Sequence, residues 1–109
     1  MRQNEIPPGT LYLLILKALA RHRELHGYEI ASWIEQVSDE VLQVEEGSLY
    51  PALQRMLVKG WVTAKWGVTA GNRRARYYRL TPLGRKQLEV EVSEFERVVA
   101  AITRAIQIA

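Results

Sequence analysis

Apolar residues recur at helical spacing in the first third of the chain. Positions 11, 14, 15, 18 and 19 are all leucine, isoleucine or alanine, which predicts a helix over residues 10–22 with one buried stripe. Positions 30, 31, 34 and 37 repeat the pattern and predict a second helix over residues 27–38. Residues 41–44 are short and rich in β-branched side chains, so they predict a small strand.

The stretch GSLYPALQRMLVKGW, residues 47–61, also has helical spacing, but it contains a proline. With Ser48 as the N-cap, Pro51 falls at the third helical position, where its missing N–H would have had no intrahelical partner. Gly60 fits the position just after the helix end, where a left-handed backbone is common. The apolar side chains gather on one face. The other face carries Ser48, Pro51, Gln54, Arg55 and Val58, with Tyr50 at its flank.

The hydrophobic period changes to two after residue 60. Residues 61–68 and 74–80 alternate as strands do, and the turn-forming residues 69–73 between them predict a β-hairpin. The tip and second strand of this hairpin carry Arg73, Arg74, Arg76 and Arg79. The tryptophans at positions 33, 61 and 66 are interpreted as core and sheet packing.

Thr81 and Pro82 fit the N-cap and first position of a last helix. Its apolar residues are spaced 4, 3, 4, 3 and 4 apart, which is the a/d pattern of a helix seam. The seam consists of Leu88, Val92, Phe95, Val99, Ile102 and Ile106. A helix over residues 82–107 would be about 39 Å long, which is more than so small a domain can cover. We therefore predict that a second copy of the chain covers the seam.

Charge is distributed unevenly along the chain, although the net charge is only +3. Residues 24–46 carry seven acidic and no basic side chains, whereas residues 47–81 carry seven basic and no acidic ones. A block of one sign on the third helix and the hairpin predicts a surface that binds a polyanion. The alternative is a solvated basic face.

Composition and motifs exclude several other classes. The chain has no cysteine, so disulfides and thiolate metal sites are excluded and a cytoplasmic location is expected. Residues 11–20 resemble a secretory signal, but Lys17 interrupts the apolar run and favours a core helix; no run reaches the roughly 20 apolar residues of a membrane span. His22 and His26 lack a third ligand, which favours surface or capping roles over a metal site. With no catalytic set and no phosphate-binding loop, neither an enzyme nor a cofactor is predicted.

A helix with a polar face, followed at once by a basic hairpin, is typical of a winged helix-turn-helix. In that arrangement the helix enters the major groove of double-stranded DNA, and the hairpin arginines lie along the backbone or in the minor groove. For Tyr50 the alternative is packing against the hairpin, and for Pro51 it is a simple helix-starting role. The predicted DNA contacts are Ser48, Tyr50, Pro51, Gln54, Arg55, Lys65, Arg73, Arg74 and Arg76.

Three segments together resemble the PadR family of bacterial transcriptional regulators: ELHGYEIA, VLQVEEGSLYPALQRMLVKGWV and NRRARYYRLTPLGRKQLE. The similarity covers roughly residues 9–108 and is closest to the short subgroup with a single C-terminal helix. It implies a winged helix-turn-helix homodimer, usually a repressor, that binds a palindromic operator. The LYPAL helix would be the recognition helix and the RRARYY strand the wing. The expected fold is mainly α, with a winged helix-turn-helix in residues 1–81 and a dimerisation helix in residues 82–109 that form one structural unit.

Phe95 has two interpretations. It is an ordinary seam residue, or it is a stacking surface for a flat ligand between two subunits, because aromatic faces suit planar guests. Some relatives of the family bind planar drugs or phenolic compounds at the dimer interface through an aromatic residue of the last helix. The comparable position here is Phe95, where a drug-binding relative favours tryptophan. Two further hypotheses for the whole protein are a winged-helix protein–protein module without DNA binding and a small-molecule sensor that recruits another protein.

Overall fold

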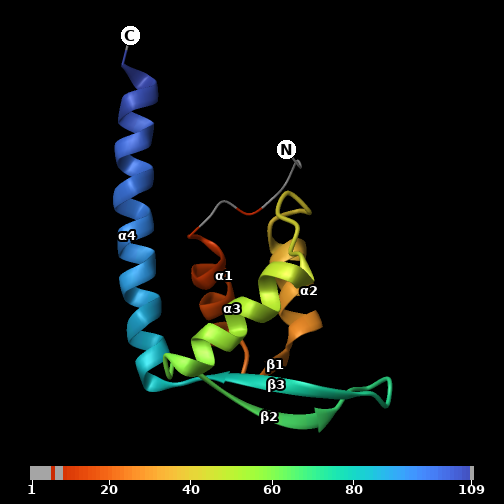
Figure 1. The fold of residues 1–109 in the computed structure, drawn as a ribbon. Helices are drawn as coiled ribbons and strands as arrows, with labels where there is room; N and C mark the ends of the chain where they lie inside the picture. Colours follow the sequence, from red (N-terminus) through yellow and green to blue (C-terminus); the bar gives the residue numbers. More distant parts are fainter. Residues whose placement is uncertain (1–5, 7–8, 109) are drawn as a thin grey trace.

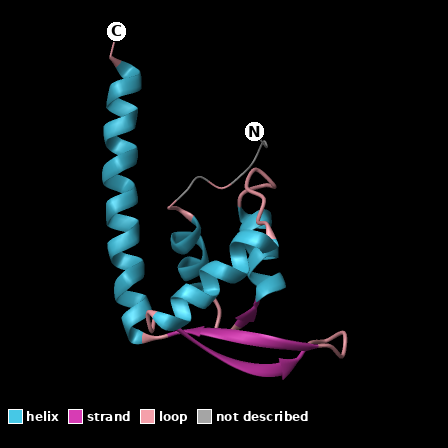
Figure 2. Ribbon diagram, in the orientation of Figure 1, coloured by secondary structure: helices cyan, strands magenta, loops and turns pink. Residues whose placement is uncertain are grey.

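The computed structural model of the 109-residue chain describes residue 6 and residues 9–108. Three helices lie on one face of a small antiparallel sheet, and a long fourth helix rises from the end of the sheet opposite the hairpin tip (Figure 1 and Figure 2). The strand order in the sheet is β1–β3–β2. In chain order the elements are α1 (Leu11–Arg21), β1 (Leu25–His26), α2 (Gly27–Val37), α3 (Glu46–Val58), β2 (Val62–Val68), β3 (Arg74–Leu80) and α4 (Pro82–Gln107).

The core lies between the first three helices and the inner face of the sheet. Its largest fully buried side chains are Ile15, Leu16, Leu19, Ile30, Ile34, Leu49, Leu53 and Met56. Val62 of β2 and Tyr78 of β3 close the core from the sheet side. Each large apolar side chain contributes about 1.5–3 kcal/mol on burial. The two predicted N-terminal helices are thus confirmed, and residues 11–20 form a core helix.

The predicted hairpin is confirmed, with β2 and β3 paired along their whole length from Val62 opposite Leu80 to Val68 opposite Arg74. The third strand, β1, has only two residues, and it pairs with the other edge of β3. The sequence pattern did not predict β1, because two residues are too few for an alternation to be visible. This short strand fixes the start of α2 against the sheet.

The strand predicted over residues 41–44 does not form, and only Gln43 makes a single β-bridge. Asp39 and Glu40 adopt the left-handed backbone conformation, with φ of 51° and 64°, and they turn the chain sharply after α2. Beyond the turn, the Val44 N–H donates to the Glu35 carboxylate at 3.0 Å. A side chain therefore satisfies a backbone group that would otherwise need a partner strand.

The predicted start of α3 is also wrong. The helix begins at Glu46, with Glu45 in extended conformation as the N-cap, and Ser48 lies inside the first turn. The Ser48 and Leu49 N–H groups both donate to the Glu45 carbonyl, at 3.0 and 2.9 Å, which sets the earlier start. Pro51 is consequently the sixth helical residue rather than the third. The helix continues through Pro51. Because proline has no N–H, the hydrogen bond to the carbonyl of residue 47 is missing.

Hydrogen bonds of Thr81 connect the end of α3 to the start of α4. Gly60 has a φ of 78°, and the Gly60 and Trp61 N–H groups close the helix end on the carbonyls of Leu57 and Met56. The Thr81 hydroxyl accepts from the Gly84 N–H at 2.9 Å and lies 2.7 Å from the Gly60 carbonyl oxygen. The predicted C′ glycine and the threonine N-cap are both confirmed.

Gly84→Ala is expected to lower the free energy of unfolding by about 3 kcal/mol, because overpacking against backbone cannot relax easily. A Cβ at this position would lie 2.1 Å from the Trp61 carbonyl oxygen. Gly47→Ala is the control, since a Cβ there meets nothing within 4 Å. In a helix this control should raise stability, by up to about 1 kcal/mol. Urea denaturation of the three proteins measures both effects; an unchanged midpoint for Gly84→Ala would contradict the tight junction.

The seam of α4 is covered only near its beginning. Leu88 packs against the core, whereas Phe95 is 42% exposed and Ile106 is 76% exposed. The helix extends away from the other elements, as the 57 Å longest dimension of the chain indicates (Figure 1). The apolar stripe from Phe95 onward is therefore bare in a single copy of the chain. Among the described helices, none is both long and apolar enough to cross a membrane.

Candidate nucleic-acid interface

One side of α3 is open to solvent along its whole length. Leu49, Ala52, Leu53 and Met56 are buried in the core, whereas the predicted contact residues Ser48, Tyr50, Pro51, Gln54 and Arg55 are all exposed. Their helical positions divide them between two flanks. Tyr50 and Gln54 lie on the flank towards the hairpin, and Ser48 and Arg55 lie on the flank towards α1.

A groove of about 810 Å³ separates α3 from the hairpin. One wall is formed by Tyr50 and Gln54 of α3, together with the first turn of α2. The other wall contains three of the four arginines of the predicted hairpin, Arg73, Arg74 and Arg76, and the aromatic side chain of Trp66. The groove thus brings residues of α3 and the hairpin together, as the sequence predicts.

Tyr50 packs closely over the start of α2. A Cβ at Gly27 would lie 2.6 Å from the Tyr50 hydroxyl oxygen, so only glycine leaves room for this ring. Behind it, burial raises the pKa of the Tyr78 phenol above its ordinary value, while the nearby Arg76 guanidinium opposes the shift. Tyr50 remains 46% exposed, so its ring is both held in place and accessible.

Trp66 stands between two arginines on the groove side of the hairpin. The Arg74 and Arg76 guanidinium carbons lie 4.8 and 5.8 Å from its ring centroid. Its side chain is 59% exposed, so Trp66 does not pack in the core. It packs on the sheet, beside its cross-strand neighbour Arg76. The hairpin extends beyond the helices at this point, and the strand alternation that buries Val62 leaves Trp66 without a core to face. The ring holds the two guanidinium groups by cation–π attraction instead.

Lys65 lies on the opposite face of the hairpin. Strand alternation places it on the face away from Val62 and Trp66. Its ammonium group is 3.7 Å from a carboxylate oxygen of Glu24, and Arg79 lies 3.5 Å from the same oxygen. These two cations are partly neutralised, and the structure does not bring Lys65 together with the groove residues.

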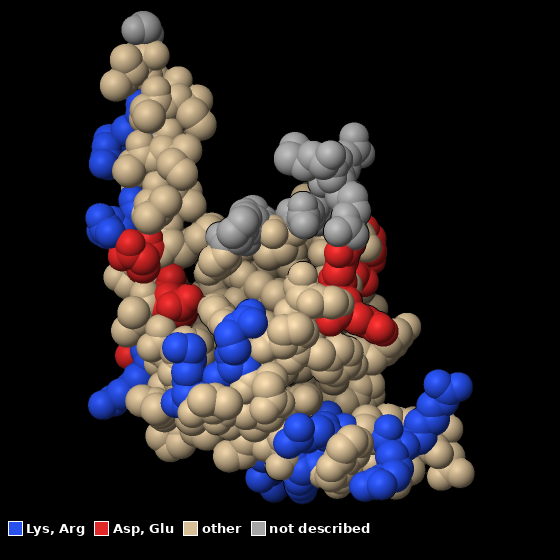
Figure 3. Space-filling model, in the orientation of Figure 1, with Lys and Arg blue, Asp and Glu red and all other residues tan. Residues whose placement is uncertain are grey.

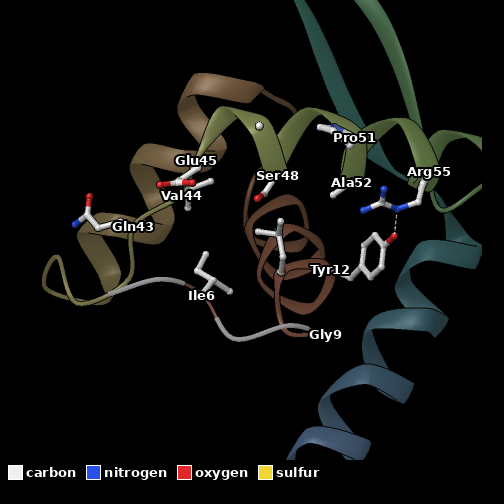
Figure 4. A pocket seen from close by; sticks show the side chains of 12 residues that line it. Ile6, Gly9, Tyr12, Gln43, Val44, Glu45, Ser48, Pro51, Ala52 and Arg55 are labelled. Atoms are coloured by element: carbon white, nitrogen blue, oxygen red, sulfur yellow. Dashed lines mark hydrogen bonds between the residues drawn. The ribbon is translucent and has the colours of Figure 1, made fainter. Parts of the chain in front are cut away.

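A second hollow, of about 420 Å³, lies on the other flank of α3 (Figure 4). Ser48, Pro51 and Arg55 of α3 line one side of it, and Tyr12 of α1 lines the other. The Arg55 Nε–H donates to the Tyr12 hydroxyl, and the guanidinium carbon lies 5.6 Å from the centroid of the same ring. The sequence pattern gave no indication of this pair, because Tyr12 lies outside the apolar stripe of α1.

Figure 3 shows basic side chains along the sheet and hairpin, a mixture of basic and acidic side chains on α4, and acidic side chains near the end of α2. Among the described residues, the lysine and arginine salt bridges engage Lys65, Arg79 and Arg97. No carboxylate of the described residues lies within 4 Å of a nitrogen of Arg55, Arg73, Arg74 or Arg76. Positive charge on the groove walls is thus left unneutralised, which favours an anionic partner.

The two histidines have structural roles. The His26 Nδ1 accepts from the Glu29 N–H at 3.4 Å, and the Glu29 carboxylate accepts from the His26 N–H at 3.0 Å, which makes a reciprocal cap for α2. The His22 Nδ1 lies 2.8 Å from the Ala18 carbonyl oxygen. The predicted capping role is confirmed for His26. In the described part of the chain, no group of three metal-binding side chains is present.

Known proteins match this chain over most of its length. An uncharacterized protein of Lysinibacillus sphaericus is 32% identical over 98 residues, which cover 90% of this chain and 89% of the relative. A transcriptional regulator from Clostridium thermocellum is 30% identical, with a TM-score of 0.80 over 88% of this chain and 92% of its own. Bacillus subtilis PadR in complex with operator DNA shares the fold, with a TM-score of 0.68 and 24% identity over 80% of this chain and 48% of its own.

The sequence model described as "Transcriptional regulator PadR-like family" matches residues 15–90. This region runs from the middle of α1 to the first turns of α4 and contains α3 and the whole hairpin. The match therefore includes both walls of the groove. The chain belongs to the PadR-like family of transcriptional regulators.

Proposed function

We propose that this protein is a homodimeric repressor that binds a palindromic operator in double-stranded DNA. The observation that carries this proposal is the groove between α3 and the hairpin, whose arginines have no carboxylate partner among the described residues. DNA is the polyanion that fits a helix beside a basic hairpin, because the major groove admits the helix and the adjacent backbone meets the hairpin.

Each part of the interface has a distinct task in this proposal. Gln54 and Arg55 reach base edges, which identify the sequence. Arg73, Arg74 and Arg76 hold phosphate groups, which fix the position of the protein on the duplex without reading sequence. Tyr50 donates its hydroxyl to the strand that passes through the groove. Ser48 and Pro51 lie against the DNA surface, and Lys65 contributes only at long range.

The bare seam of α4 supports a two-fold dimer. A second copy buries the stripe from Phe95 to Ile106, and residues 82–109 act as the dimerisation helix of a unit whose DNA-binding part is residues 1–81. Two copies of α3 about 34 Å apart then enter successive major grooves, which requires a palindromic site. Phe95, at the middle of the seam, offers an aromatic face to a planar effector that would release the DNA.

A titration against the DNA upstream of the protein's own gene tests the proposal. Fluorescence anisotropy with this duplex and with a shuffled duplex of equal length should give at least 100-fold tighter binding to the upstream site. Equal binding to both duplexes would reject sequence-specific regulation, and the absence of binding to either would favour the protein–protein module. Transcription from the same promoter in vitro, with and without the protein, separates repression from activation.

DNA binding is expected to depend strongly on salt. If about 6 phosphates are neutralised by the dimer, the logarithm of the association constant should fall against the logarithm of the salt concentration with a slope near −5. Anisotropy titrations between about 50 and 200 mM potassium chloride, where such contacts change affinity by orders of magnitude, measure the slope. A slope near zero would exclude phosphate contacts by the hairpin.

A further inference from the structure

We propose that Tyr12 of α1 is a positioning residue for Arg55 and thereby contributes to operator recognition from outside α3. This inference rests on the proposed function. Its structural basis is the hydrogen bond from the Arg55 Nε–H to the Tyr12 hydroxyl (Figure 4). The guanidinium carbon also lies 5.6 Å from the centroid of the same ring, within the range of cation–π attraction.

Tyr12 is itself held in place. Its ring lies 5.6 Å from that of Trp61 in an edge-to-face arrangement, with the two planes 87° apart. Trp61 follows the closed end of α3, where its N–H donates to the Met56 carbonyl at 3.0 Å. The Tyr12 hydroxyl therefore occupies a fixed place relative to α3, and it offers Arg55 one defined acceptor.

The hydrogen bond to Tyr12 uses the Nε of Arg55 and leaves both terminal nitrogens of the guanidinium group free to bind DNA. Nε is engaged by Tyr12, while Nη1 and Nη2 remain as a parallel pair of donors, and among the described residues no hydrogen bond or carboxylate engages them. Such a pair matches the two acceptors of a guanine edge or two phosphate oxygens. The side chain stands beside Ser48 and Pro51 at the exposed flank of α3.

The gain from this arrangement is entropic. A free arginine side chain loses conformational freedom when it is immobilised in a complex, and this loss lowers affinity by about 2- to 10-fold for each side chain. Because Tyr12 immobilises Arg55 before DNA binds, much of that loss falls on folding rather than on binding. A dimer carries the pair twice, so removing the hydroxyl should weaken operator binding by about 10-fold.

The test is a double-mutant cycle with Tyr12→Phe, Arg55→Ala and the combined variant. Phenylalanine keeps the ring and its contact with Trp61, so thermal denaturation should show an unchanged fold. Tyr12→Phe should bind the operator about 10-fold more weakly than wild type, whereas in the Arg55→Ala background the same change should have no effect. Equal losses in both backgrounds, or none in either, would overturn the proposal.

A second measurement follows Arg55 directly in the DNA-free protein. The Nε–H resonance of Arg55, assigned by its absence in Arg55→Ala, should exchange slowly with water in wild type and rapidly in Tyr12→Phe. Fast exchange in wild type would overturn the proposal, since the positioning bond would then be absent in solution. If wild type binds no DNA at all, the proposed function fails independently of Tyr12; binding without any contribution from Tyr12 contradicts this inference alone.

Discussion

Val99→Asp is expected to convert the protein to a monomer and to weaken operator binding by at least 100-fold, although the substitution lies far from α3 and the hairpin. Val99 is a central residue of the bare seam of α4 and is 40% exposed in the single chain. In the proposed dimer it is buried, and an unpaired carboxylate there costs several kcal/mol. A monomer engages only one half-site and loses the gain from linking two recognition helices, which commonly reaches 10²–10⁴-fold.

The matched control is Val90→Asp. Val90 is on the same helix and exposed, but its helical position places it on the side opposite the seam. This variant receives the same charge and should remain a dimer with full affinity. Sedimentation velocity and an anisotropy titration on the same samples provide the comparison. A folded, monomeric Val99→Asp protein with wild-type affinity for the full operator would refute the coupling between the seam and DNA recognition.

Most of the fold could be predicted from the sequence, because each helix and the hairpin carries its own period. The stripe of α1 and the alternation of β2 and β3 are local properties, and so are the end signals at Gly60, Thr81 and Pro82. The two wrong predictions, the strand over residues 41–44 and the start of α3, concern segments whose conformation depends on hydrogen bonds that the hydrophobic pattern does not reveal. Residues 41–44 have strand-like composition. The left-handed turn at Asp39 and Glu40 nevertheless redirects the chain before them, and the Glu35 carboxylate accepts the Val44 N–H, so the segment is stable as a loop.

The start of α3 was misplaced for a related reason. Ser48 is a good N-cap residue, and Pro51 is favourable close to a helix start. Both preferences therefore favoured a helix that begins after Ser48, later than the observed start at Glu46. The Glu45 carbonyl nevertheless accepts the first two bonds of α3. Helix preferences are weak compared with the packing of Leu49 and Leu53, which fixes the helix direction.

The candidate interface was predictable in its charge but not in its supporting contacts. The arginines of the hairpin are visible as a block without acidic residues. The aromatic partners of the basic side chains, such as Trp66 beside Arg74 of the hairpin and Tyr12 beside Arg55 of α3, come together only in the folded chain. Tyr28 and the first turn of α2 were missed as well, because nothing in their local sequence indicates that they line the groove.

The double variant Arg74→Ala/Arg76→Ala is expected to weaken binding to operator and shuffled DNA alike, by about 10³-fold in a dimer. Both guanidinium groups stand over Trp66 on the wall of the groove, and in the described part of the chain neither has a carboxylate partner. The dimer loses four phosphate contacts at about 1 kcal/mol each. The slope of log affinity against log salt should become less steep by about 3.6.

Two controls make the prediction specific to the groove. Arg97→Ala/Arg104→Ala removes the same charge from α4, which extends away from the hairpin, and it should leave the slope nearly unchanged (Figure 1). Arg74→Lys/Arg76→Lys keeps the charge but loses the planar group that stacks on Trp66, so its affinity should fall between those of wild type and the alanine variant. Salt titrations of the three variants on both duplexes give the answer. An alanine variant that lost affinity only for the operator would show that these arginines read sequence instead of holding the backbone, and equal losses in the α4 control would show that net charge alone is responsible.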